Sequence, residues 1–172
     1  SYLKIFMNVN IALLTVTDTR TFDNDKSGNI LEQKIKEAKH NLVDRKICKD
    51  NKDEIVLILN EWLKNKKIDV IVTTGGTGLT GRDITPEALE QIADKHIPGF
   101  GEVFRNLSLK TVGTSAIQSR ACAVLSNGKY VFALPGSSGG VTDAWEGILK
   151  HQLDINHKPC NFVELFPRLK EK

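Results

Sequence analysis

The sequence predicts an α/β fold of three layers, in which helices cover both faces of a mostly parallel sheet that includes one antiparallel hairpin. Two short apolar runs, Asn10–Val16 and Ile68–Val72, are typical of strands buried on both faces. Segments with apolar residues at helical spacing follow each run. Asn127-Gly128 lies between two further apolar runs and is a strong hairpin signal. Together these features favour parallel strands joined by helices, with a single hairpin.

The first half of the chain reads as two strand and helix units. The polar stretch Thr17–Lys26 follows the first strand and is expected to be a loop, with Ser27 as the N-cap of a helix. Leu42–Cys48 is extended in character, and Asp53–Asn65 is expected to be a second helix. The apolar positions that predict the two helices are Ile30, Leu31, Ile35 and Ala38, and then Ile55, Ile58, Leu59 and Trp62.

The second strand ends at glycines, and a helix is expected to begin with Thr85 as N-cap and Pro86 in its first turn. Pro98 and Gly99 are interpreted as the end of that helix. Further helices are expected at Gly101–Leu109 and, after the hairpin, at about Thr142–Leu153.

The ends of the chain are less regular. Residues 156–172 are polar, contain two prolines and are expected to form a loosely packed or oligomer-facing tail. Residues 1–6 are interpreted as a disordered, truncated or vector-derived start. Residues 7–172 are therefore assigned to one domain, which suits a chain of 172 residues.

Composition excludes several function classes. The chain is 40% hydrophobic and 26% charged, with a formal charge of +3 and no long run of one sign, so a nucleic-acid surface is not expected. Cys48, Cys122 and Cys160 match neither a metal motif nor a disulfide framework and are interpreted as reduced thiols. No apolar stretch is long enough to cross a membrane and no signal peptide is recognisable, so we expect a cytoplasmic protein without membrane association.

The segment Thr73–Glu87 has the features of a phosphate-binding loop. It reads TTGGTGLTGRDITPE and lies between a predicted buried strand and a helix N-terminus, where backbone N–H groups and the helix dipole favour anions. Gly75, Gly76 and Gly78 allow a ligand to approach the backbone closely. The order of residues matches neither the P-loop nor the dinucleotide fingerprint, and an ordinary turn also explains two of the glycines.

Two charged residues and a second loop strengthen this interpretation. Phosphate chemistry commonly needs a carboxylate for Mg²⁺ beside a cation, and Arg82 and Asp83 offer that pair. The alternatives are a loop or cap role for Asp83 and a solvated side chain for Arg82. Gly136–Gly140 is a second glycine-rich loop after a predicted strand. Because such loops gather at the carboxyl ends of the strands, we expect a composite site.

Four ordered motifs give the chain a resemblance to a known family. They are TTGGTGLTGRDITPE, GFGEVFR at Gly99–Arg105, GTSAIQSRA at Gly113–Ala121 and LPGSS at Leu134–Ser138. From about Asn10 to Asn161 the chain resembles the MoaB/MogA family of molybdenum cofactor biosynthesis proteins, and it is more similar to the MoaB branch. The resemblance implies self-association as trimers or hexamers, and contact with other proteins of the molybdenum cofactor pathway.

The resemblance also implies an activity, the adenylylation of molybdopterin. Mg²⁺-ATP and molybdopterin would give adenylyl-molybdopterin and pyrophosphate, so Mg²⁺ is the implied cofactor and ATP and molybdopterin are the implied substrates. Positioning and electrostatics account for most of such a transfer.

Matching residue by residue, the resemblance implies the site. Asp83 and Asp50 fall on the family's catalytic, metal-binding aspartates, although Lys49 replaces the usual proline before Asp50. The implied binding residues are Gly75, Gly76, Thr77, Gly78, Arg82, Glu102, Ser119, Arg120, Pro135, Gly136 and Ser137.

Simpler roles remain for several of these residues. Asp50 also suits a helix-start carboxylate, and Glu102 a surface one. Ser119 and Arg120 also suit a helix end, and Ser137 a turn. At the level of the whole protein, a non-catalytic molybdopterin-binding or assembly protein of the same fold is the main alternative. A phosphosugar- or nucleotide-binding protein unrelated to molybdenum would require four ordered motifs to coincide by chance.

Overall fold

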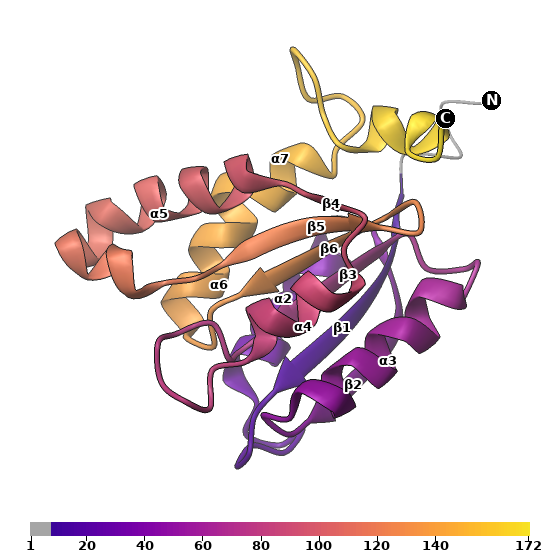
Figure 1. Cartoon of the computed structure of the whole chain (residues 1–172). Helices are drawn as coiled ribbons and strands as arrows, with labels where there is room; N and C mark the ends of the chain where they lie inside the picture. Colours follow the sequence, from indigo (N-terminus) through magenta and orange to yellow (C-terminus); the bar gives the residue numbers. More distant parts are fainter. Residues whose placement is uncertain (1–7) are drawn as a thin grey trace.

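The computed structural model describes residues 8–172, so the expectation for residues 1–6 lies outside this part of the chain. It contains a six-stranded sheet of order β2-β1-β3-β6-β5-β4. The strands are β1 (Asn10–Val16), β2 (Asn41–Cys48), β3 (Val70–Thr74), β4 (Lys95–His96), β5 (Cys122–Ser126) and β6 (Lys129–Leu134). Strands β2, β1, β3 and β6 are parallel, whereas β5 is antiparallel to β6 and β4 to β5. The mostly parallel sheet with an antiparallel hairpin is confirmed (Figure 1). The short edge strand β4 was not expected.

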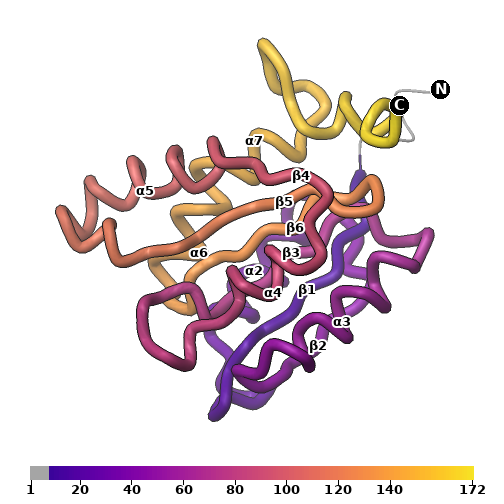
Figure 2. The backbone as a smooth tube through the Cα atoms, viewed as in Figure 1, coloured from indigo at the N-terminus to yellow at the C-terminus, as the bar shows by residue number. Residues whose placement is uncertain are grey.

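Helices cover both faces of this sheet, as predicted (Figure 2). The elements are α2 (Lys26–Glu37), α3 (Lys52–Lys64), α4 (Thr85–Ile92), α5 (Pro98–Val112), α6 (Ser138–Ala144) and α7 (Lys150–Gln152), with the short helical segments η1 (Gly113–Gln118), η2 (Trp145–Leu149) and η3 (Val163–Arg168). Apolar residues of α3 and α4 pack on one face, and those of α2, α5, α6 and η2 pack on the other.

The two apolar clusters follow from strand geometry, because successive side chains of a strand point to opposite faces. In β1, Ile11 and Leu13 belong to the cluster under α2 and α5, whereas Ala12 and Leu14 belong to the cluster under α3 and α4. All four side chains are fully buried. The near-continuous apolar run therefore does mark a strand covered on both faces.

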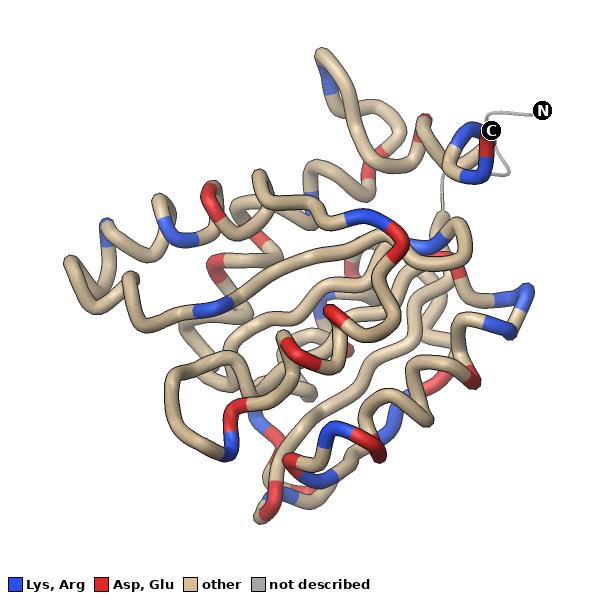
Figure 3. Tube along the Cα trace, in the orientation of Figure 1, with Lys and Arg blue, Asp and Glu red and all other residues tan. Residues whose placement is uncertain are grey.

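Basic and acidic residues are interspersed along the trace (Figure 3).

The predicted hairpin is confirmed, and its turn explains its sequence. Asn127 and Gly128 have φ angles of 49° and 73°, and Ser126 is aligned with Lys129. Positive φ at both central residues defines the turn that matches the twist of the flanking strands, and Asn-Gly suits this turn well.

Two predicted N-caps are wrong. Helix α2 is capped by Asp25, whose carboxylate accepts from the Gly28 N–H at 3.1 Å, so Ser27 lies within the helix. Helix α4 has no side-chain cap, because Ile84 occupies its N-cap position and Thr85 is its first residue. The Thr85 hydroxyl instead donates to the Gly75 carbonyl at 2.8 Å. Thr85 thus ties the glycine-rich loop to the helix that follows it.

The predicted bounds of two helices are also wrong. Pro98 and Gly99 do not end α4; they begin α5, because proline is well tolerated in the first turn of a helix. The last long helical segment begins at Ser138 rather than at Thr142. Its N-cap is Ser137, whose hydroxyl accepts from the Gly140 N–H at 3.0 Å.

The tail prediction needs correction as well, because part of the tail packs on the core. The Tyr130 hydroxyl donates to the Phe162 carbonyl at 2.7 Å, and the two rings stack with centroids 4.6 Å apart. Val163 is fully buried. Tyr130 lies near the start of β6, so this contact is at the end of the strand opposite to the Leu134 end. The loosely packed tail is therefore wrong for this segment, while oligomer contacts of the tail stay a prediction.

Candidate functional site

The site lies where four parallel strands end together. Thr74 of β3 is aligned with Thr15 of β1 and with Leu134 of β6, and Val16 of β1 is aligned with Cys48 of β2. The loops that follow these strands therefore leave the sheet side by side. This edge is where open α/β sheets bind their ligands.

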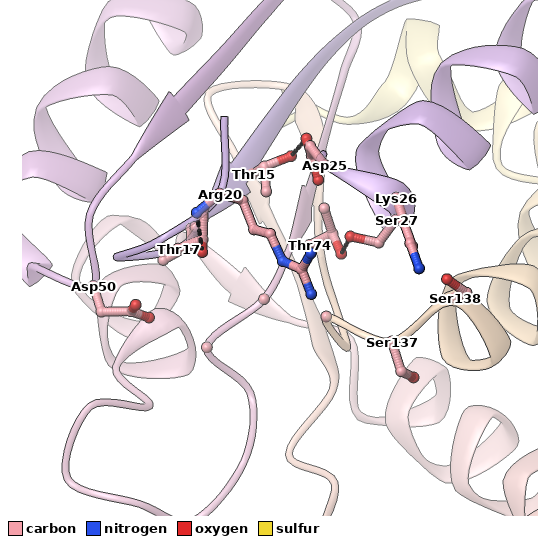
Figure 4. Close-up of a pocket in the computed structure, with 14 residues that line it drawn as sticks. Thr15, Thr17, Arg20, Asp25, Lys26, Ser27, Asp50, Thr74, Ser137 and Ser138 are labelled. Atoms are coloured by element: carbon pink, nitrogen blue, oxygen red, sulfur yellow. Dashed lines mark hydrogen bonds between the residues drawn. The ribbon is translucent and has the colours of Figure 1, made fainter. Parts of the chain in front are cut away.

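Two of the cavities at this edge are lined by the glycine-rich loops. The first, of about 370 Å³, is lined by many polar and charged residues and is shown in Figure 4. It is lined by Thr15, Val16, Thr17, Arg20, Asp25, Lys26, Ser27, Asp50, Thr74, Gly75, Gly76, Gly136, Ser137 and Ser138. Its walls thus come from the loops after β1, β2, β3 and β6. We call it the polar cavity.

The second cavity, of about 660 Å³, has apolar walls as well as polar ones, and we call it the wide cavity. Phe104, Val112 and Ala116 supply apolar surface from α5 and η1. The other lining residues are Gly76, Thr77, Gly78, Asp83, Ser108, Thr111, Ser115, Gln118, Ser119, Pro135, Gly136, Ser137, Gly139, Gly140 and Asp143.

The two cavities meet at a shared wall formed by Gly76, Gly136 and Ser137, which line both. Glycine is required here by backbone geometry. Gly75 and Gly76 have φ angles of 103° and 73°, and a Cβ on Gly75 would lie 2.2 Å from the Val16 carbonyl oxygen. A Cβ on Gly136 would lie 3.3 Å from the Gly75 Cα, so the two glycine-rich loops touch. The two glycine-rich loops thus lie together as expected, while their role as one ligand site stays a prediction.

Asp83 faces the wide cavity and is held by its own loop. Its carboxylate accepts from the Thr80 N–H at 2.9 Å and from the Thr80 hydroxyl at 2.8 Å. Partial burial would raise the pKa of Asp83, but the bonds from Thr80 and Gly78 and the charge of Arg120 outweigh it and lower that pKa. Asp83 is therefore a fixed carboxylate that is ionised at neutral pH.

Asp50 lines the polar cavity in a different electrostatic setting. Burial, followed by the charges of Asp18 and Asp83, raises its pKa, and only the charge of Arg82 opposes them. The Asp50 N–H donates to an Asp18 carboxylate oxygen at 3.0 Å. The cap of α3 is Asn51, which accepts from the Glu54 N–H at 3.0 Å, so Asp50 does not cap this helix. Negative charge therefore accumulates around Asp50.

Arg120 supports the loop with its side chain. It donates from Nε to the Gly78 carbonyl at 2.7 Å, from Nη2 to the Asp83 carbonyl at 2.8 Å and from Nη1 to the Glu87 carboxylate at 2.8 Å. Its backbone N–H donates to the Thr77 carbonyl at 2.8 Å. Arg120 lines neither cavity, while its neighbour Ser119 lines the wide one.

The structure does not bring Arg82 and Glu102 into the site. Arg82 pairs with Asp18, its side chain is 77% exposed and it lines neither cavity. Glu102 is exposed on α5 and also lines neither cavity. Thr77, Gly78, Pro135, Gly136 and Ser137, which the resemblance implies as binding residues, all line the wide cavity.

The loop after β1 also contributes side chains to the site, which the sequence analysis did not predict. Asp18 contacts Asp50, and Arg20, Lys26 and Ser27 line the polar cavity. The signal for finding them was present, since this loop follows a predicted parallel strand just as the glycine-rich loops do.

Among residues 8–172, no three His, Cys, Asp or Glu side chains are grouped as a resident metal centre. Nor does any helix in that range have the length and apolar composition to span a membrane.

The fold and the two joined cavities define an open α/β protein with a candidate small-molecule site at the carboxyl ends of its strands. A family model described as "Probable molybdopterin binding domain" matches residues 12–155. The chain belongs to this family, the MoaB/MogA family of molybdenum cofactor biosynthesis proteins.

Individual relatives agree with this assignment. The chain is 43% identical over 166 residues to molybdenum cofactor biosynthesis protein B of Escherichia coli K12, with 96% of each chain covered. It is 44% identical over 154 residues to the protein of the same name from Staphylococcus aureus COL, with 88% and 91% covered.

Solved structures also agree. A crystal structure of molybdenum cofactor biosynthesis protein B has a TM-score of 0.82 at 41% identity and covers 85% of this chain and 91% of its own. The tungsten cofactor synthesizing protein MoaB from Pyrococcus furiosus has a TM-score of 0.75 at 37% identity, with 84% and 92% covered. The resemblance inferred from four motifs is therefore confirmed.

Proposed function

We propose that the protein is a molybdopterin adenylyltransferase, which transfers the adenylyl group of ATP to the terminal phosphate of molybdopterin and releases pyrophosphate. The observation that carries this proposal is the pair of cavities that meet at Gly76, Gly136 and Ser137, with Asp50 on one side and Asp83 on the other. A transfer between two substrates needs two adjoining sites and a point where the reacting phosphates meet.

The wide cavity suits molybdopterin. Its volume of about 660 Å³ is within the usual range for small-molecule sites, and Phe104, Val112 and Ala116 offer apolar surface to a flat pterin ring. Ser108, Ser115 and Ser119 offer hydroxyl groups for its polar edge. The phosphate end of the pterin would then lie at the shared wall.

The shared wall suits the reacting phosphates. Because Gly76 and Gly136 carry no side chain, phosphate oxygens can approach the backbone there. A phosphate monoester is largely ionised at neutral pH, since its second pKa is about 6. The nucleophile therefore needs no general base, and the work of the protein is to orient the two phosphates and to offset their charge.

Asp50 and Asp83 are the residues that would hold Mg²⁺. Burial and then the charges of Asp18 and Asp83 raise the pKa of Asp50, and a cation would relieve the excess of negative charge there. Mg²⁺ is usually held by one or two carboxylates together with substrate phosphates, which agrees with the lack of a resident cluster in residues 8–172. When bound, the ion would supply positive charge to the phosphates.

The proposal includes a cytoplasmic location, where ATP is available, and the three unpaired cysteines suit a reducing compartment. Assembly as trimers or hexamers stays a prediction, which light scattering of the purified protein tests.

A non-catalytic binding or assembly role is the alternative. The position of Arg82 favours it, because this arginine pairs with Asp18 and its side chain lines neither cavity. Turnover separates the two functions, whereas binding of molybdopterin alone does not.

The test uses purified protein, Mg²⁺, ATP and molybdopterin, with pyrophosphate and adenylyl-molybdopterin measured together. We expect product from the wild type and a loss of about 10²-fold or more in kcat for Asp83→Asn, since one preorganised charged group contributes on this scale. Asp53→Asn is the matched control, because Asp53 is exposed and lines neither cavity. A folded wild type that binds molybdopterin and forms no product would contradict the enzyme and support the binding role.

A further inference from the structure

The polar cavity is lined by two cationic side chains, Arg20 and Lys26, that have no role in the proposed function so far. Arg20 lies in the loop after β1, and Lys26 is the first residue of α2, whose N-terminus adds positive potential. Figure 4 shows both side chains pointing into the space bounded by Thr74, Ser137 and Ser138.

These two charges are available to a ligand. Within residues 8–172 the ammonium group of Lys26 has no ion pair or hydrogen bond, and the Arg20 guanidinium makes one bond, from Nη1 to the Asn24 carbonyl at 3.3 Å. Both residues are exposed rather than fixed by neighbours. The positive charges of Arg20 and Lys26 are therefore not compensated by ion pairs within residues 8–172.

Asp25 lines the same cavity but does not cancel them. Its carboxylate accepts from the Thr15 hydroxyl at 2.6 Å, from the Gly28 N–H at 3.1 Å and from Arg45 Nη2 at 2.9 Å. Asp25 is 1% exposed, so its charge is matched by Arg45 within the protein. Arg20 and Lys26 remain as a positive wall facing the cavity.

The stereochemistry of the proposed reaction suggests a role for Arg20 and Lys26, and this inference rests on the proposed function. In phosphoryl and adenylyl transfer the attacking and leaving oxygens lie roughly in line. If the molybdopterin phosphate attacks from the wide cavity at the shared wall, the leaving group points to the opposite side. Gly76 and Gly136 also line the polar cavity, so this cavity adjoins the reaction point and is the space available to the leaving group.

We propose that Arg20 and Lys26 form the subsite for the β- and γ-phosphates of ATP and for the pyrophosphate that leaves. The new bond joins a phosphate oxygen of molybdopterin to the α-phosphorus. The bond from the α-phosphorus to its bridging oxygen breaks, and the electron pair stays on that oxygen of pyrophosphate. The two cations receive the charge that accumulates on the leaving group.

Asp50 defines the form of this ligand. Its carboxylate lines the same cavity and repels a bare polyphosphate, so the subsite is suited to pyrophosphate that carries Mg²⁺. Recognition is thus of a magnesium-bound diphosphate and not of a single anion.

The experiment measures binding of magnesium pyrophosphate, ATP and AMP by calorimetry, and inhibition of turnover by pyrophosphate. We expect Lys26→Gln and Arg20→Gln each to weaken magnesium pyrophosphate and ATP binding about tenfold, as for the loss of one charge-assisted contact, with AMP binding unchanged. Lys26→Arg should retain most of the affinity, because it keeps the charge.

Lys36→Gln is the matched control. It removes the same charge from the same helix at a side chain that is 62% exposed and outside the cavity, and it should bind all three ligands as the wild type does. The subsite would be overturned if Lys26→Gln and Arg20→Gln both bound magnesium pyrophosphate with wild-type affinity. It would also be overturned if their affinity for AMP fell as much as their affinity for magnesium pyrophosphate. Binding that depends on Lys26 in a protein without turnover would keep the subsite and reject the adenylyl transfer.

Discussion

The Nη1 atom of Arg120 donates to both carboxylate oxygens of Glu87 at 2.8 Å, and this pair joins the segment after η1 to helix α4. The remaining donors of the same guanidinium hold the carbonyls of Gly78 and Asp83. The loop that carries Asp83 is therefore fixed at both ends by one side chain. Arg120 is therefore a positioning residue for Asp83 and lines neither cavity.

Replacing Arg120 by Gln should destabilise the protein by about 1–3 kcal/mol, because partly buried carbonyls and Glu87 lose charge-assisted bonds. In denaturant unfolding, Arg168→Gln is the matched control, since Arg168 makes an exposed pair with Glu171 that should contribute little to stability. If the free energy of unfolding falls equally in the two variants, Arg120 does not hold the Asp83 loop in place.

The glycine-rich loop next to the shared wall should tolerate no side chain at Gly75. Gly75→Ala combines a φ of 103° with a Cβ only 2.2 Å from the Val16 carbonyl oxygen, and we expect a loss of about 2–4 kcal/mol. Gly81→Ala lies in the same loop with nothing within 4 Å of its Cβ, so its free energy of unfolding should change by less than about 1 kcal/mol. Thermal unfolding of the two variants checks this, and similar melting temperatures would refute the steric account.

The carboxylates around Asp50 should make stability depend on pH. Burial and the charges of Asp18 and Asp83 raise the pKa of Asp50 above its ordinary value of 3.8, so the native state binds this proton more tightly than the unfolded chain does. The stabilising contribution of the protonated form is present below 3.8 and is lost as the pH rises through the raised pKa.

Asp50→Asn should therefore match the wild type in stability at acid pH and exceed it at neutral pH. The gain should stay below about 1 kcal/mol, because Asp50 is partly exposed and solvent screens the repulsion. Denaturant unfolding at the two pH values measures it, with Asp53→Asn as the exposed control. A gain that is independent of pH would show that charge repulsion is not its cause.

The aromatic contact of the tail should affect stability without affecting the site. Phe162→Ala removes the ring that stacks on Tyr130, and we expect a loss of about 2–3 kcal/mol. Since this contact lies at the far end of β6, ligand affinity at a temperature where the variant is folded should equal that of the wild type. A change in affinity for magnesium pyrophosphate would mean that the tail is coupled to the cavities.

The local features of the sequence determined the sheet, the glycine-rich loops and the family. Apolar runs such as Asn10–Val16 predict buried strands because both faces of a parallel sheet are covered, and Asn127-Gly128 predicts its turn because few residues accept positive φ. Helix ends were harder to predict. Asp25 and Ser27 are both suitable caps, and the buried bonds of Asp25 to Thr15 and Arg45 decided between them.

Only the tertiary structure decided how the site is divided and which residues share it. Asp18, Arg20 and Lys26 reach the site because β1 pairs with β3, a contact between segments far apart in sequence that spacing alone does not specify. The same holds for Arg120, whose partners lie on the Asp83 loop, and for Glu102, which α5 directs away from both cavities. Residue types and local spacing thus predict which chemistry a chain contains, whereas strand order determines which of those groups face one another.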